Sequence, residues 1–356
     1  MMNSLLICPE YFDGRLNGIG RVSEAISETL SLTAFSTEVW SANEVKGAAE
    51  FALGRAFGRN YYRMTLAGVL SPAKGVRLVG AVHLGLSPVA RLVAWRRRCP
   101  YFVFIHGVEA WKPLRARSRW GLKGARVLLF NSRHTMLRFG KVNPSLANLP
   151  SKVVELGVTE PECINVPANG SFQILCVTRL TKSCSHKNIR VLIDAVAEVG
   201  ASCPKARLVV VGDGNDRQDL ELYAKARLAS ERYLFTGKIS DKEVAQWRNR
   251  SAVFALPSEQ EGFGLVFAEA MAAGLPCVCG STDASSEVVE NGVTGFCVNP
   301  RKPKEVAAAL LQILTDQVLR DRMSTAARSR FERLYTKAAF QMRFKAALQE
   351  YSLAPT

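Results

Sequence analysis

The sequence lacks the features that mark membrane-spanning, secreted and metal-binding proteins. Its 356 residues include no run of 18 uninterrupted apolar residues, and the first eight residues contain no basic segment, so we expect neither a spanning helix nor a signal peptide. The nine cysteines form no Cys-x-x-Cys pair, and the four histidines are not spaced to complete a zinc site. With 48% hydrophobic and 22% charged residues, a compact cytoplasmic protein with reduced, mostly buried thiols is predicted.

Acidic residues are almost absent from one long stretch. Residues 51–154 contain a single acid, Glu109, and residues 1–152 hold 22 Lys or Arg against 8 Asp or Glu. Most of the formal net charge of +16 therefore belongs to the N-terminal half, which indicates an anionic partner for that half. A basic nucleic-acid-binding protein without enzyme activity is the alternative. The sequence shows no recognition helix or interleaved aromatic platform, so we expect no nucleic acid partner.

Apolar runs typical of strands alternate with helical periodicity along the chain. This alternation, with short connections, predicts an α/β fold of two Rossmann-like, doubly wound domains with parallel sheets covered on both faces. The predicted strands are 5–8, 38–40, 76–82, 101–105, 127–130, 152–156, 172–177, 206–211, 233–236, 253–256 and 277–279. The predicted helices include 21–32, 88–98, 190–199, 216–229, 241–250 and 266–273.

The boundary between the two domains is predicted from composition. Residues 158–171 carry two prolines, a glycine and several polar residues before a new apolar strand begins, which is typical of a linker. We therefore predict an N-terminal, acceptor-binding domain at 1–165 and a C-terminal, nucleotide-sugar-binding domain at 166–335. Residues 303–353 indicate three helices, and the last segment, 336–356, is a helix that can return to the N-terminal domain.

The most informative segment runs from Glu261 through Gly-Phe-Gly-Leu-Val-Phe-Ala to Glu269 and follows the predicted strand 253–256. It places a glycine-containing loop at a helix N-terminus. Backbone N–H groups and the positive end of the helix dipole suit a diphosphate there, and Gly262 and Gly264 allow a close approach. The two carboxylates suit an elongated ligand with a hydroxyl-bearing sugar at one end and a ribose at the other. An ordinary turn with two exposed glutamates is the alternative.

This Glu-x7-Glu segment resembles the retaining nucleotide-sugar glycosyltransferases of family 4, which have the GT-B fold of two Rossmann-like domains facing across a cleft. Other landmarks agree in order and spacing: Val177-Thr-Arg-Leu180, Lys187-Asn-Ile189, Val211-Gly-Asp-Gly214, Phe235-Thr-Gly-Lys-Ile-Ser240 and Asn291-Gly-Val-Thr-Gly295. The resemblance covers essentially the whole chain. It implies metal-independent, retaining transfer of a hexose from a GDP- or UDP-sugar by same-face substitution, with no cofactor besides the donor substrate.

The resemblance also implies roles for individual residues. Arg179 and Lys187 would clamp the departing diphosphate, which gathers negative charge in the transition state. Lys182 is an alternative second cation, and Asn188 stands where many members have glycine. The implied catalytic residues are His106, Arg179, Lys187 and Glu261. The implied donor-binding residues are Gly18, Gly20, Arg179, Lys187, Gly262, Phe263, Gly264, Leu265 and Glu269.

Two glycines follow the first predicted strand and open a helix, at Asn17-Gly18-Ile-Gly20. This segment resembles the family's glycine-rich loop against the donor diphosphate. An NAD-dependent enzyme would need a third glycine where Ser23 stands, so the Gly-x-Gly-x-x-Gly pattern is not met.

Histidine side chains follow two predicted strands of the N-terminal domain. His106 comes directly after the strand 101–105, and doubly wound sheets bind ligands at the carboxyl ends of their strands. We expect His106 to face the cleft and contact the donor sugar. Glu109 either positions His106 or the acceptor or forms a local salt bridge, and His83 either lines the cleft or packs in the core.

The stretch from His83 to Trp111 resembles bacterial enzymes that add mannose or glucose to polyprenyl-diphosphate-linked glycans of surface exopolysaccharides. It implies a lipid-linked or soluble glycan acceptor and a peripheral position at the inner face of the cell membrane. The basic half would dock on anionic lipid, with Trp95 and Trp111 as interfacial anchors; packing of Trp95 against a neighbouring helix is the alternative. The expected basic contributors are Arg96, Arg97, Arg98, Arg115, Arg117 and Arg119.

Overall fold

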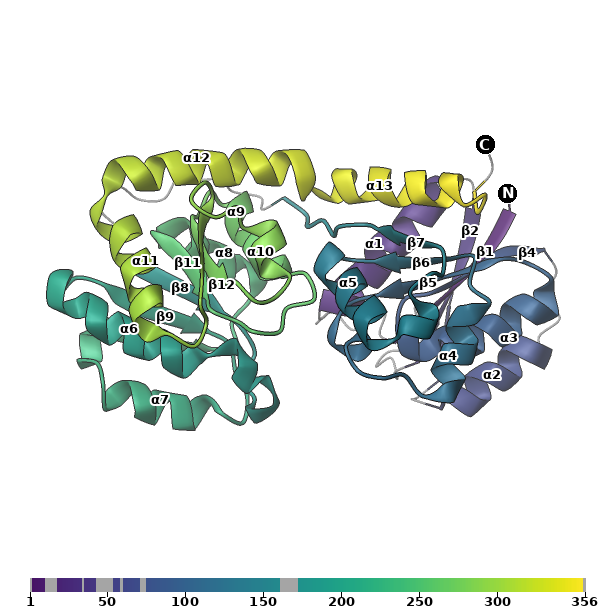
Figure 1. Cartoon of the computed structure of the whole chain (residues 1–356), viewed down its shortest axis with the longest axis horizontal. Coiled ribbons are helices and arrows are strands. Elements are labelled where there is room, and N and C mark those ends of the chain that lie inside the picture. The colour runs from purple at the N-terminus through teal and green to yellow at the C-terminus, as the bar shows by residue number, and fades with distance from the viewer. Residues whose placement is uncertain are drawn as a thin grey trace. The chain divides into compact units, whose positions relative to one another are not determined.

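The computed structural model describes residues 2–9, 18–33, 35–42, 54–57, 60–70, 75–160 and 172–354. The chain divides into two compact units, drawn in Figure 1. Unit 1 comprises Met1–Leu156 with Lys337–Thr356, and unit 2 comprises Gly157–Thr336. The predicted boundary at 165/166 and most of the predicted linker lie outside the described residues, whereas the last segment of the chain is part of unit 1.

Unit 1 is a parallel sheet with helices on both faces (Figure 1). The strand order is β3-β2-β1-β4-β5-β6-β7. The strands are β1 Met2–Cys8, β2 Phe35–Ser41, β3 Gly54–Ala56, β4 Val76–Ala81, β5 Tyr101–Ile105, β6 Val127–Phe130 and β7 Ser151–Val153. The helices are α1 Gly18–Leu32, α2 Tyr61–Leu70, α3 Ser87–Arg97, α4 Ala116–Lys123, α5 Arg133–Val142 and α13 Lys337–Glu350. Every residue of β5 and β6 is buried, as continuous apolar strands in a doubly covered sheet must be.

Unit 2 repeats this architecture with the strand order β10-β9-β8-β11-β12-β13, again all parallel. The strands are β8 Gln173–Val177, β9 Arg207–Val211, β10 Tyr233–Gly237, β11 Val253–Leu256, β12 Cys277–Gly280 and β13 Gly295–Val298. The helices are α6 Ile189–Ser202, α7 Arg217–Lys225, α8 Asp241–Arg250, α9 Leu265–Ala272, α10 Ser285–Val288, α11 Pro303–Thr315 and α12 Gln317–Leu334.

The structure confirms the predicted alternation of strands and helices. Each predicted strand overlaps an observed one, and the three helices expected in 303–353 are α11, α12 and α13. In both units the strand order reverses once, between β1 and β4 in unit 1 and between β8 and β11 in unit 2. Ligands of doubly wound sheets bind at the carboxyl ends of the strands at such a reversal. Within the part of the chain that the structure describes, no helix is long and apolar enough to cross a membrane.

Candidate functional site

The carboxyl ends of β8 and β11 present the two loops that carry most of the predicted donor residues. Arg179 follows β8, and the segment that contains Glu261 follows β11. β8 and β11 are neighbours at the reversal of the sheet, so the loops that leave them are adjacent. A backbone hydrogen bond joins them, since the Glu259 N–H donates to the His186 carbonyl at 2.9 Å. The fold therefore assembles one site from two segments about 75 residues apart in sequence.

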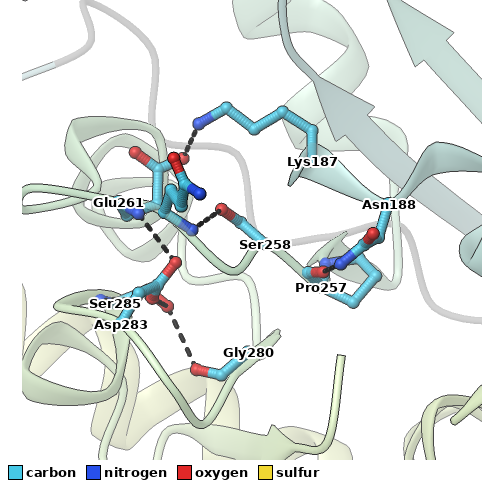
Figure 2. Close-up of polar contacts among 9 residues, drawn as sticks. Lys187, Asn188, Pro257, Ser258, Glu261, Gly280, Asp283 and Ser285 are labelled. Atoms are coloured by element: carbon cyan, nitrogen blue, oxygen red, sulfur yellow. Dashed lines mark hydrogen bonds and ion pairs between the residues drawn. The ribbon is translucent and has the colours of Figure 1, made fainter. Parts of the chain in front are cut away.

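The Lys187 ammonium is paired with the Glu261 carboxylate (Figure 2). Lys187 ends the 3-10 helix Lys182–Lys187, and its Nζ contacts Glu261 Oε1. Both side chains are mostly buried, with 16% and 14% of their surfaces exposed. The sequence analysis named both residues, and the structure brings them into direct contact.

Asn188 explains how the chain turns from Lys187 into α6. Its backbone is left-handed, with φ of 55°, a conformation open to glycine and tolerated by asparagine. The side-chain amide donates to the Pro257 carbonyl and to Glu259 Oε1, each at 3.0 Å. Asparagine therefore satisfies the same backbone requirement as the glycine of many family members, and it also ties the Lys187 turn to the loop after β11.

Arg179 is exposed on the loop after β8. The residues before and after it donate backbone hydrogen bonds to β9 and to the turn that follows β9. The Thr178 N–H donates to Val211 O, and the Leu180 N–H donates to Asp213 O, both at 3.0 Å. Gly212 has φ of 143°, and a Cβ there would lie 1.8 Å from the Thr178 carbonyl oxygen, so only glycine allows this contact.

His186 lies between Lys187 and the loop after β11. Burial lowers the pKa of His186, and the positive charge of Lys187 lowers it further, while the negative charge of Glu261 opposes this shift. Lys182, the alternative cation, is exposed and pairs instead with Asp219 Oδ2 at 3.3 Å.

Asp283 is a site residue that the sequence analysis missed. It follows β12 and is 1% exposed, and its Oδ2 accepts the Glu261 backbone N–H at 2.8 Å (Figure 2). Its Oδ1 accepts the Ser285 backbone N–H at 3.0 Å and also the Ser285 hydroxyl. Burial, helped by the nearby negative charge of Glu261, raises the pKa of Asp283 to about 6. The signal available in the sequence was an aspartate just after a predicted strand at the ligand-binding edge of the sheet.

The loop 262–264 leads into α9 through a left-handed residue. Gly264 has φ of 96°, and a Cβ there would lie 2.7 Å from the Phe267 ring. The first N–H groups of α9, which begins at Leu265, have no acceptor within the helix and suit an anion. Phe263 is 4% exposed and packs edge-on against Tyr335, so its side chain belongs to the core and only its backbone can meet a donor. The expectation that Phe263 binds the donor stays a prediction, and it concerns the backbone of this residue.

Glu269 forms an ion pair that the sequence did not reveal. Its Oε2 contacts the Arg248 guanidinium, and only 13% of each side chain is exposed. Arg248 lies on α8, and no local pattern links that helix to Glu269. The carboxylate expected to bind a ribose is therefore held in place and neutralised by Arg248.

In unit 1, His106 stands at the carboxyl end of β5, as predicted. It is 9% exposed, and its Nε2 lies 2.7 Å from the Val82 carbonyl, which can only accept, so Nε2 carries the proton. Glu109 Oε1 accepts the His106 backbone N–H at 2.6 Å. Glu109 therefore contacts the backbone of His106, and its role toward the acceptor stays a prediction. Burial lowers the pKa of His106, which keeps the ring neutral near pH 7.

His83 and the two glycines complete the predicted residues of unit 1. His83 caps the 3-10 helix Leu84–Leu86 by accepting the Gly85 N–H at 3.0 Å, and its ring stacks 6.5 Å from that of His106. Gly18 and Gly20 form the first turn of α1, after the carboxyl end of β1. The loop before Gly18 lies outside the described residues.

The tryptophans of unit 1 differ from the expectation. Trp111 is 7% exposed and packs against His134 and beneath Arg138, so it is not an interfacial anchor. Trp95 is 74% exposed near the end of α3. Trp120, on α4, is 42% exposed and was not considered, and the Arg91 guanidinium lies 4.3 Å from its ring.

Residues 164–330 match the family model of the glycosyl transferases group 1. The alpha-D-kanosaminyltransferase of Streptomyces kanamyceticus is 32% identical over 140 residues, which is 39% of this chain and 36% of the relative. The GDP-mannose-dependent alpha-(1-6)-phosphatidylinositol monomannoside mannosyltransferase of Mycobacterium tuberculosis is 30% identical over 151 residues, or 40% of this chain and 38% of the relative. The chain thus spans little more than a third of these two relatives.

A solved structure matches over nearly the full length. Alr3699/HepE of Anabaena, crystallised in complex with UDP, has a TM-score of 0.78 and 18% identity, covering 98% of this chain and all of that one. This likeness covers both units and confirms the expected GT-B fold of two Rossmann-like domains. The match to the family model lies in unit 2.

Proposed function

We propose that this chain, whose residues 164–330 match the family model of the glycosyl transferases group 1, transfers a hexose from a nucleoside diphosphate sugar to a glycan acceptor. We propose mannose or glucose as the hexose and GDP or UDP as the nucleotide. The relatives support these choices, since one is named for GDP-mannose and HepE was crystallised with UDP.

The observation that carries the proposal is the Lys187–Glu261 ion pair at the reversal of the unit 2 sheet, where the loop with Arg179 also leaves β8. A nucleoside diphosphate brings two phosphates to this edge, where two cations and the N-terminus of α9 can bind them. Arg179 is exposed and Lys187 is mostly buried, so the first can meet the ligand from solvent while the second has a fixed position.

In this mechanism the sugar leaves the diphosphate as negative charge builds on the β-phosphate. Arg179 and Lys187 stabilise that charge, and because Glu261 holds Lys187 in place before the reaction, Lys187 needs little reorganisation. Glu261 orients Lys187 and accepts a hydroxyl hydrogen bond from the donor sugar, while Glu269, held by Arg248, accepts from the ribose. His106 is proposed to contact the donor sugar, as the family resemblance implies.

The mechanism is proposed to be retaining and metal-independent. The acceptor attacks the face from which the diphosphate leaves, within a short-lived ion pair, and the two cations take the place that a metal would have. Among the described residues, no group of three or more His, Cys, Asp or Glu is placed to hold a metal ion, and metal independence stays a prediction.

We propose a lipid-linked acceptor, a role in exopolysaccharide synthesis and a peripheral position at the inner face of the cell membrane. α3 and α4 pack together and carry an exposed basic set with two exposed tryptophans. Its members are Trp95, Arg96, Arg98, Arg115, Arg117, Arg119 and Trp120. Arg91, Trp95, Arg96 and Arg98 line a cavity of about 620 Å³ that can receive an anionic headgroup. We name this set the α3–α4 basic surface.

The proposal is tested first by nucleotide binding. UDP, GDP, ADP and their hexose derivatives are added to the protein, and the rise in Tm is measured for each. One nucleotide and its hexose derivative should raise Tm by several degrees, and that derivative should then release nucleoside diphosphate when a polyprenyl-diphosphate-linked glycan is added. No shift with any nucleotide, together with no release, would refute the proposal.

A further inference from the structure

Two thiols lie side by side on the last two strands of the unit 2 sheet. Cys279 on β12 and Cys297 on β13 are direct partners in the parallel register, and their Sγ atoms are 3.4 Å apart. Cys279 is fully buried, whereas Cys297 is only partly buried and belongs to the edge strand of the described sheet. One thiol is therefore enclosed and its partner can be reached from solvent.

We propose that Cys279 and Cys297 form a reversible disulfide when the protein meets hydrogen peroxide. The backbone geometry allows it, because neighbouring strands lie about 4.8 Å apart and disulfides join Cα atoms about 4.4–6.8 Å apart. Closing the Sγ–Sγ distance from 3.4 Å to about 2.0 Å needs only small side-chain rotations and a slight movement of the edge strand.

Cys297 is the attacking thiol. The Cys279 thiol donates a hydrogen bond to the Cys297 sulfur, which lowers the pKa of Cys297 by stabilising its thiolate. Burial raises the pKa of Cys279, which keeps its proton. A partly exposed thiol whose thiolate form is stabilised by a neighbouring thiol is the arrangement that peroxide oxidises and a resolving cysteine then captures.

The reaction balances in two steps. The Cys297 thiolate attacks one peroxide oxygen, the S–O bond forms, the O–O bond breaks and hydroxide leaves, giving a sulfenic acid. The Cys279 sulfur then attacks the Cys297 sulfur, the S–S bond forms, the S–O bond breaks, and the departing hydroxide takes the Cys279 proton as water. Two thiols are oxidised, and one peroxide is reduced to water.

The disulfide would shift the loop that holds Glu261, because a chain of contacts connects β12 to that loop. Ser285 contacts the Cys279 sulfur, donates to the Gly280 carbonyl at 3.2 Å and also bonds Asp283, which accepts the Glu261 N–H (Figure 2). Gly280 packs directly against Ser258, since a Cβ on it would lie 1.9 Å from the Ser258 carbonyl oxygen. Moving the end of β12 therefore strains the loop that holds Glu261.

Cys277 provides a matched control. It lies on the same strand and face as Cys279 and is fully buried, but its partner across the register is Gly295, which has no side chain. Cys277 should therefore not take part in the cross-link.

The experiment treats the reduced full-length protein with hydrogen peroxide, blocks remaining thiols and digests with a glutamate-specific protease without reduction. Cleavage after glutamates separates peptide 270–287, with Cys277 and Cys279, from peptide 291–305, with Cys297. The expected product joins these two peptides and disappears on dithiothreitol treatment. Cys277→Ala should keep the cross-link, and Cys279→Ala and Cys297→Ala should each abolish it.

Several outcomes would overturn the proposal. One is a stable sulfinic acid on Cys297 without a cross-link, another is a cross-link that survives Cys279→Ala, and the third is no oxidation at all. If Cys279→Ala does not fold, loss of the cross-link is tested with Cys297→Ala alone. Hydrogen exchange tests the effect on Glu261, because the oxidised protein should exchange the amides of residues 257–264 several-fold faster than the reduced one. Equal exchange rates in the oxidised and reduced protein would show that the disulfide does not affect the loop that holds Glu261. Neither measurement depends on the proposed glycosyl transfer.

Discussion

Lys187 and Glu261 are 74 positions apart in sequence, yet they form a mostly buried ion pair at the carboxyl edge of the unit 2 sheet. Its position at the edge where the loop with Arg179 leaves β8 gives a first prediction. Glu261→Gln and Arg179→Ala should each lower turnover by at least about two orders of magnitude, because each removes one preorganised partner of the transition state.

Transfer is measured with a donor that binding assays have identified, and folding is checked by Tm. Glu332→Gln is the matched control for Glu261→Gln, since it also removes a carboxylate that is paired with a basic side chain, here Arg328, but on the surface of α12. Near-normal turnover in Glu261→Gln or Arg179→Ala would remove that residue from the site.

Asp283 gives a second prediction, on pH. Its pKa is raised to about 6 in the folded protein, above the value near 3.9 of an unfolded chain. The folded state therefore binds the proton more tightly, so Asp283 favours folding at low pH and this contribution is lost as pH rises from about 4 to 6. Each unit of raised pKa corresponds to about 1.4 kcal/mol.

The measurement compares Tm of wild type and Asp283→Asn between pH 4.5 and 7. The amide cannot ionise, so the Tm of the variant relative to wild type should increase with pH. Asp316→Asn, at the exposed N-cap of α12, is the control and should show no such increase. A constant difference for Asp283→Asn would contradict the raised pKa.

The sequence predicted the architecture well because buried parallel strands are nearly continuous apolar runs. It missed β3 and β13, which have three and four residues and begin with glycine. Such short strands at the edge of a sheet carry little periodicity of their own and form because a neighbouring strand offers hydrogen-bonding groups. The two strands that the sequence did not predict therefore form through pairing with a neighbouring strand and not because of a local sequence pattern.

The site was predictable where a motif carries it. Lys187 and Glu261 belong to recognisable segments, and the structure places them in contact. Asp283 and Arg248 were missed because their roles arise from packing: one accepts an N–H from the loop after β11, and the other reaches Glu269 from α8. Trp111 was misjudged for the same reason, since a tryptophan beside basic residues can pack inward as readily as it can face solvent.

The Arg248–Glu269 pair gives a third prediction. Glu269→Ala should weaken nucleotide binding and also lower stability by about 3 kcal/mol, because it leaves the mostly buried Arg248 charge without its partner. Adding Arg248→Met should recover much of the lost Tm but not the nucleotide-induced shift. If the double variant regained nucleotide binding, Glu269 would have only a structural role.

Chelation gives a fourth prediction. Transfer should persist in excess EDTA, because Arg179 and Lys187 provide the positive charge that the departing diphosphate needs. The rate is measured before and after chelation, and again after adding magnesium or manganese. Loss of transfer on chelation and its recovery with either metal would refute the metal-free mechanism.

The α3–α4 basic surface gives the last prediction, that unit 1 binds anionic membranes. Each basic residue near such a surface contributes about 1 kcal/mol, so replacing Arg115, Arg117 and Arg119 with alanine should weaken liposome binding by about two orders of magnitude. Trp95→Ala should weaken it further, because an exposed indole can insert at the headgroup level.

The control replaces three exposed basic residues of unit 2, Lys225, Lys242 and Arg322, and should leave binding unchanged. Co-sedimentation is measured with anionic and zwitterionic vesicles at low and high salt, since screening must reverse an electrostatic contact. Equal binding to both lipids, or to neither, would mean that the charge of unit 1 serves a soluble anionic acceptor.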